Sequence, residues 1–180
     1  MLGSLVAFVP FAYFFILKEY QKTRILTFLN PESDLLGSGW NVTQSMIAVG
    51  SGGLFGKGLF HGTQSKLKFL PESHTDFIGA VFLEETGFAG GLVLLALYYS
   101  LIYNIVRIGN SSNDEYGRLI CYGVAAIIFF HTTVNLGMII GIMPVTGLPL
   151  LLMSYGGSSY IFTFMMLGIV QSVKVHSDKY

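Results

Sequence analysis

The chain has 180 residues, of which 52% are hydrophobic and only 11% are Asp, Glu, Lys or Arg. Soluble domains carry roughly 25% charged residues, so this composition excludes an ordinary soluble protein. Ten basic and ten acidic side chains cancel, which excludes a bulk positive field that would attract nucleic acid. Cys121 is the single cysteine and cannot form an internal disulfide.

Charged residues are absent from the stretches 1–17, 86–106 and 119–173, which are 17, 21 and 55 residues long. A helix needs an apolar run of about 20 residues to cross a bilayer. The third stretch fits two helices, because Pro144 and Pro149 interrupt it. The sequence therefore predicts an all-α membrane protein with four transmembrane helices and one long loop.

The charge pattern also sets the expected order of these parts. We expect membrane helices over 1–17, 76–106, 119–142 and 150–173, a large loop over 18–75, a connection over 107–118, a turn over 143–149 and a tail over 174–180. Four crossings place both chain ends on one side of the membrane, and the large loop lies opposite the 107–118 connection. The positive-inside rule applies to loops of up to about 60 residues, so it hardly decides which side the large loop occupies.

A run of six glycines lies between Gly50 and Gly62 in the large loop. Its GGLFGK segment has three residues between glycines where a nucleotide P-loop needs four, and Gly58 stands where a P-loop has Ser or Thr. The pattern excludes a P-loop and is typical of a glycine-rich turn.

Asp76 lies where the polar loop becomes an apolar helix. Partial desolvation at such an interface makes a carboxylate a stronger proton acceptor, as a general base requires. An Asp directly before an apolar run is equally typical of a helix N-cap. The residues alone leave both interpretations open.

Glu84 and Glu85 follow Asp76 by eight and nine positions, or about 12–13 Å along a helix. This spacing exceeds the roughly 5–10 Å of a glycosidase carboxylate pair and excludes a hydrolytic dyad with Asp76. Carboxylates in a membrane segment usually face a polar cavity or a partner. Glu84 lies about 80° round a helix from Asp76 and Glu85 about 180°, which favours Glu84 for the face of Asp76.

His74 and Asp76 form an H-x-D pair beside Glu72. Without an H-E-x-x-H motif or clustered cysteines, we expect no metal site built from protein groups alone. A Mg²⁺ or Mn²⁺ ion that arrives with a phosphorylated substrate fits better, because these ions often use one or two carboxylates plus substrate phosphates.

Two further patterns concern helix packing. Gly87 and Gly91, and again Gly137 and Gly141, have the G-x-x-x-G spacing that lets helices approach closely, within the chain or with a partner. His131 and Asn135 are four residues apart, so they share a helix face that is expected to meet a polar cavity or a neighbouring helix.

Three long motifs carry a family resemblance: NPESDLLGSGWNVTQS, GSGGLFGKGLFHGTQSKLKFLPESHTDFIGAVFLEETG and GIMPVTGLPLLLMSYGGSSY. Together they resemble the SEDS (FtsW/RodA/SpoVE) family of cell-wall polymerases, and HGTQS before LPESHTDF is closer to its rod-shape branch than to its division branch. The resemblance covers nearly the whole chain. It implies the last four helices of a ten-helix fold in the bacterial cytoplasmic (inner) membrane, with the large loop extracytoplasmic.

The resemblance also implies a function. Family members are inverting glycosyltransferases that join the disaccharide-peptides of lipid II into glycan strands for cell-wall elongation and cell shape. Asp76 falls on the essential aspartate of the HTDF motif and is the expected catalytic residue. The residues expected to bind substrate are Lys57, Lys66, Lys68, His74, Glu84 and Asn135.

The same resemblance supplies the expected partners and cofactors. A class B penicillin-binding protein is the expected protein partner, Mg²⁺ or Mn²⁺ is expected with the substrate pyrophosphate, and no organic cofactor is expected. Two alternatives stay open: a lipid II flippase, which intramembrane carboxylates would serve equally well, and a non-catalytic scaffold for a penicillin-binding protein.

Overall fold

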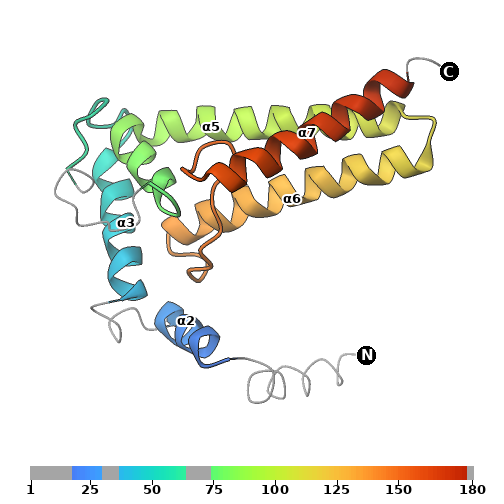
Figure 1. Ribbon diagram of the computed structural model, residues 1–180. Coiled ribbons are helices and arrows are strands. Elements are labelled where there is room, and N and C mark those ends of the chain that lie inside the picture. The colour runs from blue at the N-terminus through green and yellow to red at the C-terminus, as the bar shows by residue number, and fades with distance from the viewer. Residues whose placement is uncertain (1–17, 30–36, 64–73, 178–180) are drawn as a thin grey trace, which may run out of the picture.

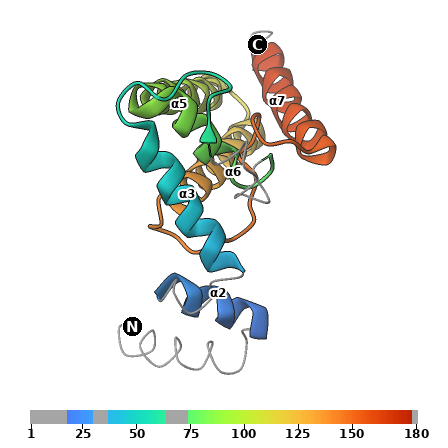
Figure 2. The same cartoon turned by 90° about the vertical axis from the view of Figure 1, so that its left-hand side faces the viewer.

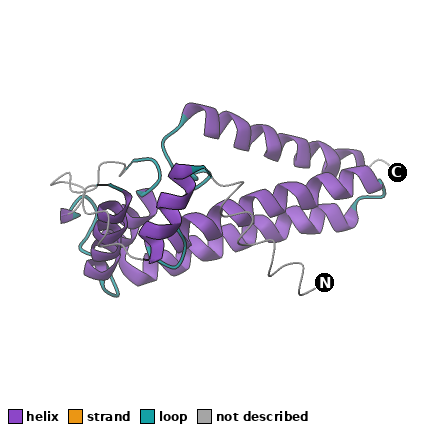
Figure 3. Cartoon of the chain, turned by 90° about the horizontal axis from the view of Figure 1, so that it is seen from below, coloured by secondary structure: helices purple, strands orange, loops and turns teal. Residues whose placement is uncertain are grey.

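The computed structural model describes residues 18–29, 37–63 and 74–177, and the helix expected over 1–17 lies outside them. The described part contains helices α2 (Glu19–Leu29), α3 (Ser38–Gly52), α5 (Ile78–Ser111), α6 (Glu115–Ile139) and α7 (Gly157–Ser177). Helices and loops account for all of these residues, with no strand among them (Figure 3). The expected all-α class is confirmed over this part of the chain.

Three of the helices, α5, α6 and α7, are long and apolar enough to cross a membrane. They run side by side, while α3 crosses one end of the group (Figure 1). Helix α7 lies beside the α5–α6 pair and diverges from it toward its own N-terminal end (Figure 3). The fourth crossing and the sidedness of the loops stay predictions.

The three long helices share one apolar core. Its buried members are Tyr98, Ile105, Cys121, Val124, Ala125, Ile128, Leu150, Leu151, Met166 and Val170. The Tyr98 hydroxyl donates a hydrogen bond to the Leu151 carbonyl, which ties α5 to the segment before α7. This bond satisfies a buried hydroxyl that would otherwise be costly in an apolar core.

The connection between α5 and α6 is shorter than the 107–118 range expected from the charges. Helix α5 continues to Ser111, and Asp114 caps α6 by accepting hydrogen bonds from the Tyr116 and Gly117 amides at 3.2 and 3.0 Å. Charged residues mark where an apolar stretch ends, but Arg and Glu are good helix formers and do not end a helix. The connection is therefore shorter than the charge pattern indicates.

The non-helical segment before α7 is longer than the expected 143–149 turn. Helix α6 ends at Ile139, where 142 was expected, and α7 begins at Gly157, where 150 was expected. Between them, the Ser154 hydroxyl accepts from the Leu150 amide at 2.7 Å, and the Ser154 amide donates back to the Leu150 carbonyl at 2.8 Å. This local turn satisfies main-chain groups that a helix would otherwise satisfy.

Helix α3, within the range expected to be a loop, packs across the end of α5 and α6 (Figure 2). Its Ala48 joins a second buried cluster with Phe77, Ala80, Met138 and Ile139. The cluster fixes the start of α5 against the end of α6, where Asp76 and the 140–156 segment lie.

Helix α5 is broken at Gly87, whose φ of 69° and ψ of −166° are not helical. In an unbroken helix the Phe88 and Ala89 amides would donate to the Glu84 and Glu85 carbonyls. Instead, the Phe88 amide donates to the Gly53 carbonyl at 2.9 Å and the Ala89 amide to the Leu54 carbonyl at 3.0 Å.

The two carbonyls freed by this break are also satisfied by the glycine-rich segment. The Lys57 amide donates to the Glu84 carbonyl, and the Gly58 amide to the Glu85 carbonyl, both at 3.0 Å. Residues 53–58 therefore insert into the broken helix and replace both of its missing hydrogen bonds.

This insertion requires glycine at the points of closest approach. A Cβ atom on Gly56 would lie 2.1 Å from the Glu85 carbonyl oxygen, and one on Gly52 would lie 2.3 Å from the Leu83 carbonyl oxygen. A Cβ atom on Gly87 would lie 2.3 Å from the Gly56 nitrogen. Real Cβ atoms do not approach main-chain atoms this closely, so the glycine run specifies a close backbone crossing.

We expect Gly87→Ala to destabilise the protein, because alanine would occupy a glycine-only backbone region and collide with residue 56. The backbone strain alone corresponds to about 1–3 kcal/mol of unfolding free energy. Thermal unfolding of the purified protein in detergent measures this. Gly123→Ala in α6 is the matched control, since nothing lies within 4 Å of its added methyl group. Equal stability of the two variants would contradict the inserted-segment geometry.

Candidate active site at the start of α5

Asp76 lies in the turn that leads into α5 and is partly buried. The N-cap position of α5 belongs to Phe77, which makes no side-chain capping hydrogen bond. Asp76 therefore directly precedes the cap position, and both interpretations of its carboxylate stay predictions.

Asn135 holds the main chain of Asp76 in place. Its fully buried side-chain amide donates to the Asp76 carbonyl and to the Leu148 carbonyl, each at 2.8 Å. Its Oδ1 atom has no hydrogen-bond partner within the described residues and lies toward Gly79, at 3.6 Å from where a Cβ would stand. The substrate-binding role expected for Asn135 stays a prediction; its two hydrogen bonds join α6 to the turn before α5 and to the 140–156 segment.

The turn at Gly147 faces the Asp76 carboxylate. A Cβ atom on Gly147 would lie 3.4 Å from Asp76 Oδ2, and the φ of Gly147 is 71°. On one side of this turn Asn135 binds Leu148, and on the other the Arg24 guanidinium donates to the Thr146 carbonyl at 2.9 Å. Gly147 thus lies beside the Asp76 carboxylate, in a turn that Asn135 and Arg24 hold by hydrogen bonds on either side.

His74 lines a cavity beside the turn that leads into α5. The cavity has a volume of about 330 Å³ and is lined by His74, Ile78, Met153, Tyr155 and Tyr160. The His74 carbonyl accepts from the Tyr155 amide at 2.9 Å, and the residue itself is exposed. His74 is thus placed two residues before Asp76 on a surface open to a ligand.

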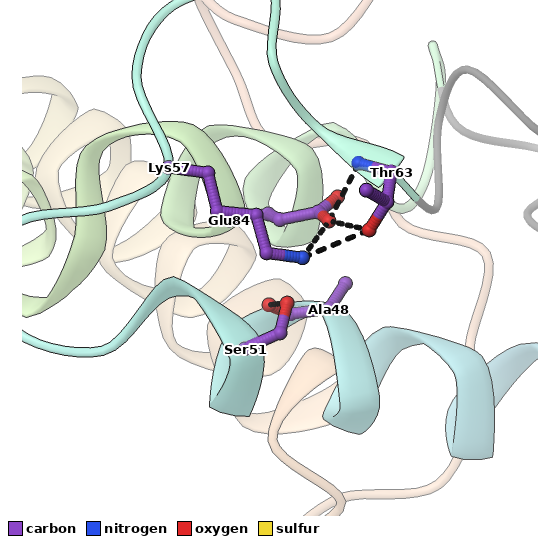
Figure 4. A network of polar contacts seen from close by, with 5 residues as sticks. All are labelled: Ala48, Ser51, Lys57, Thr63 and Glu84. Atoms are coloured by element: carbon purple, nitrogen blue, oxygen red, sulfur yellow. Dashed lines mark hydrogen bonds and ion pairs between the residues drawn. The ribbon is translucent and has the colours of Figure 1, made fainter.

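Glu84 forms a second cluster with the glycine-rich segment (Figure 4). Its side chain is fully buried and accepts from the Lys57 ammonium at 2.7 Å and from the Thr63 amide and hydroxyl at 2.8 Å each. The Lys57 ammonium also donates to the Thr63 hydroxyl at 2.8 Å. A buried carboxylate is tolerated when it is paired and hydrogen-bonded in this way.

This cluster bears on the substrate-binding role expected for Lys57. Its ammonium is compensated by Glu84, so it is less available to neutralise a substrate pyrophosphate than a free lysine would be. Lys66 and Lys68 lie outside the described residues, and their expected role stays a prediction. Over the described residues, no three His, Cys, Asp or Glu side chains are grouped to hold a metal ion.

His131 and the glycines of the two G-x-x-x-G spacings contact other residues of this chain. The His131 ring nitrogen Nδ1 lies 3.2 Å from the Pro149 carbonyl oxygen. Cβ atoms on Gly91, Gly137 and Gly141 would meet Leu83, Met143 and Met46, respectively, at 2.6 to 3.0 Å. Gly141 lies beyond the end of α6. These three glycines therefore lie against side chains of this chain, and a partner at the G-x-x-x-G spacings stays a prediction.

Sequence reasoning did not single out Arg24, Thr63 or Gly147 as site residues. Arg24 is far from Thr146 in sequence, and no periodic pattern links the two. Thr63 stands in the HGTQS motif and Gly147 in PVTGLP, so the family motifs contained both but assigned them no role.

A family model described as a cell cycle protein, FtsW/RodA/SpoVE, matches residues 1–179. The chain belongs to this family. Among similar proteins, the peptidoglycan glycosyltransferase MrdB of Escherichia coli strain K12 is 51% identical over 170 residues, which are 94% of this chain and 46% of that protein. The peptidoglycan glycosyltransferase RodA of Treponema pallidum is 48% identical over 88% of this chain and 36% of that protein. This chain thus spans about half the length of the curated relatives it matches, or less.

Solved structures agree with this assignment. One from a peptidoglycan synthase complex that coordinates polymerization and crosslinking matches with a TM-score of 0.72 and 36% identity, over 99% of this chain and 48% of that one. An aspartate-to-alanine variant of the rod shape determining protein RodA of Thermus thermophilus matches with a TM-score of 0.56 and 39% identity, over 76% and 40%. The helical arrangement described above is therefore that of part of a SEDS protein.

We expect the Lys57–Glu84 pair to be strongly coupled. Lys57→Met leaves a buried carboxylate without its cation, which typically lowers the unfolding free energy by about 3–5 kcal/mol. Adding Glu84→Gln removes the uncompensated charge, so the double variant should recover part of that loss. Thermal unfolding of the two single variants and the double variant gives the coupling energy.

Arg118→Met serves as the control for this cycle, because its ion pair with Glu115 is exposed, with side-chain exposures of 43% and 85%. Exposed pairs contribute about 0–1 kcal/mol. Additive losses for Lys57→Met and Glu84→Gln would show that the pair carries no coupling of its own.

Proposed function

We propose that this chain contributes the catalytic carboxylate and its supporting turns to a peptidoglycan glycosyltransferase that uses lipid II. The observation that carries the proposal is the placement of Asp76 beside Gly147, with its main chain bound to the buried Asn135. Support comes from 51% identity to a protein named as a peptidoglycan glycosyltransferase.

The proposed reaction is one inverting displacement. The acceptor 4-hydroxyl oxygen attacks the anomeric carbon of the donor sugar, which is α-linked to pyrophosphate, and a β linkage forms as the bond to pyrophosphate breaks. Asp76 accepts the proton of the attacking hydroxyl, so a single base suffices. The bond electrons leave with the pyrophosphate, which needs charge neutralisation rather than an acid.

The cations for this leaving group are also part of the proposal. Arg24 is a candidate that the fold adds, because its guanidinium binds the Thr146 carbonyl in the turn that faces Asp76. Lys66 and Lys68 remain candidates from the sequence. A Mg²⁺ or Mn²⁺ ion bound to the pyrophosphate would supply the same neutralisation, with substrate phosphates as its main ligands.

The proposed setting is the bacterial cytoplasmic membrane with the 18–75 segment outside, in association with a class B penicillin-binding protein. The structural relative from a peptidoglycan synthase complex supports such a partner. A flippase would need no base at Asp76. A glycan-strand assay and a lipid II flux assay on one preparation separate the polymerase from the flippase.

We expect Asp76→Asn to abolish most polymerisation, because asparagine keeps the shape of the side chain but cannot accept a proton. Losing a general base typically lowers the rate by about 10²–10⁴-fold. The assay follows glycan strands made from lipid II by a full-length polymerase in which this chain replaces the matching segment of the Escherichia coli relative.

The control for this assay is the thermal stability of the same variant and its co-purification with the penicillin-binding protein, both of which should be unchanged. Near-normal glycan synthesis by Asp76→Asn would reject Asp76 as the base.

The proposed sidedness has its own test, in which a single cysteine is placed at Ser65 or at Ser112. An impermeant thiol reagent added to intact cells should label the first and spare the second, because the two positions lie on opposite sides of the membrane. Native Cys121 is buried and gives little background. Labelling only at Ser112 would reverse the orientation.

A further inference from the structure

The glycine-rich segment carries two Leu-Phe pairs that the described fold leaves exposed. The exposed fractions are 68% for Leu54, 84% for Phe55, 66% for Leu59 and 79% for Phe60. Single exposed apolar residues are ordinary, but four large ones in one short segment indicate an interaction surface.

The exposure of these pairs does not come from a loosely attached loop. Gly53 and Leu54 accept hydrogen bonds from α5, and Lys57 and Gly58 donate hydrogen bonds to it. Between and beyond the pairs, Lys57 and Thr63 bind the buried carboxylate of Glu84. The chain thus uses several main-chain bonds and an ion pair to hold these apolar side chains away from its own core.

The backbone conformation of Phe60 also indicates that the surrounding structure holds the exposed pairs in place. Its φ is 62°, in the left-handed region that bulky side chains rarely adopt. Strained conformations of this kind persist where the surrounding structure imposes them, and they are common at functional sites.

The position of the segment along α5 indicates what covers it. Helix α5 has 34 residues, or about 51 Å at 1.5 Å per residue, whereas the hydrocarbon core of a bilayer is about 30 Å thick. The charge-free stretch begins at residue 86, directly at the break where residues 53–58 insert. The break therefore lies near one boundary of the membrane core.

The sequence before the segment lacks charged residues, and the part of α5 beside it exposes large apolar side chains. Residues 35–56, which include α3, contain no Asp, Glu, Lys or Arg. Phe88, whose amide binds Gly53, is 61% exposed, and Leu92 one turn further on is 53% exposed. Leu54 of the first pair is therefore bound to α5 at the point where the exposed apolar side chains of that helix begin.

We propose that the two Leu-Phe pairs insert into the membrane leaflet at this end of α5 and anchor the glycine-rich segment in it. The occupant of the surface is the acyl-chain layer of the bilayer, which accepts large apolar side chains from a polar boundary. The anchor fixes the depth of the break in α5 and, through the preceding helical turns, the height of Asp76 above the hydrocarbon.

The test uses tryptophan as a depth probe in the full chain, reconstituted in phosphatidylcholine vesicles. Trp40→Phe first removes the one native tryptophan. Phe55→Trp and Phe60→Trp are then added in separate variants. Vesicles made with phosphatidylcholine brominated near the upper acyl carbons should quench most of the emission of both probes, while aqueous iodide should quench little of it.

Two matched controls calibrate the result. Leu95→Trp reports an exposed apolar position within the charge-free stretch of α5, and Tyr116→Trp reports the polar end of α6, where the native side chains are 49% and 73% exposed. Iodide quenching of positions 55 and 60 at the level of position 116 would overturn the proposal. Protection from both quenchers would overturn it as well, because protein rather than lipid would then cover the pairs.

Discussion

Main-chain hydrogen bonding at the break in α5 is the constraint on which the rest of the site depends. A buried amide or carbonyl without a partner is costly, and within a membrane there is no water to satisfy it. The break at Gly87 frees two amides and two carbonyls, and residues 53–58 supply partners for all four. The glycine-rich segment and α5 must therefore fold as one unit. The end of α5 that leads back to Asp76 is consequently held by a segment far from it in sequence.

The Lys57–Glu84 pair strengthens this unit by side-chain contacts. Burial removes hydration from the Glu84 carboxylate, and the three hydrogen bonds from Lys57 and Thr63 offset that cost. Pairs of this kind contribute little net stability compared with an apolar packing, but breaking one of them is expensive. The pair therefore specifies one arrangement of the segment. A pyrophosphate that recruited Lys57 would have to compete with a carboxylate 2.7 Å away, which favours other cations for the leaving group.

Much of the fold could be predicted from the sequence, and the misses have physical causes. Charge-free stretches located α5, α6 and α7, because the cost of charge in a bilayer is large and local. They misplaced helix ends, since Asp114 caps α6 through a local contact and residues up to Ser111 stay helical. The sequence predicted that carboxylates in this helix meet a polar cavity or a partner, as buried Glu84 does, but it did not predict Lys57 as that partner, because the break at Gly87 depends on a backbone crossing that no periodicity records.

The contacts around Asp76 hold its main chain, and they are distinct from its carboxylate, the group proposed to react. Asn135 binds the Asp76 carbonyl rather than its carboxylate, so it fixes the residue without using a lone pair that a substrate hydroxyl would need. The facing turn is held at Thr146 by Arg24 and at Leu148 by Asn135, on either side of Gly147. Both tethers end on main-chain carbonyls, and the φ of 71° at the residue between them favours glycine, which places no side chain beside the carboxylate. In the proposed reaction the base must meet a sugar hydroxyl at hydrogen-bond distance, and a residue without a Cβ atom beside the carboxylate is compatible with that approach.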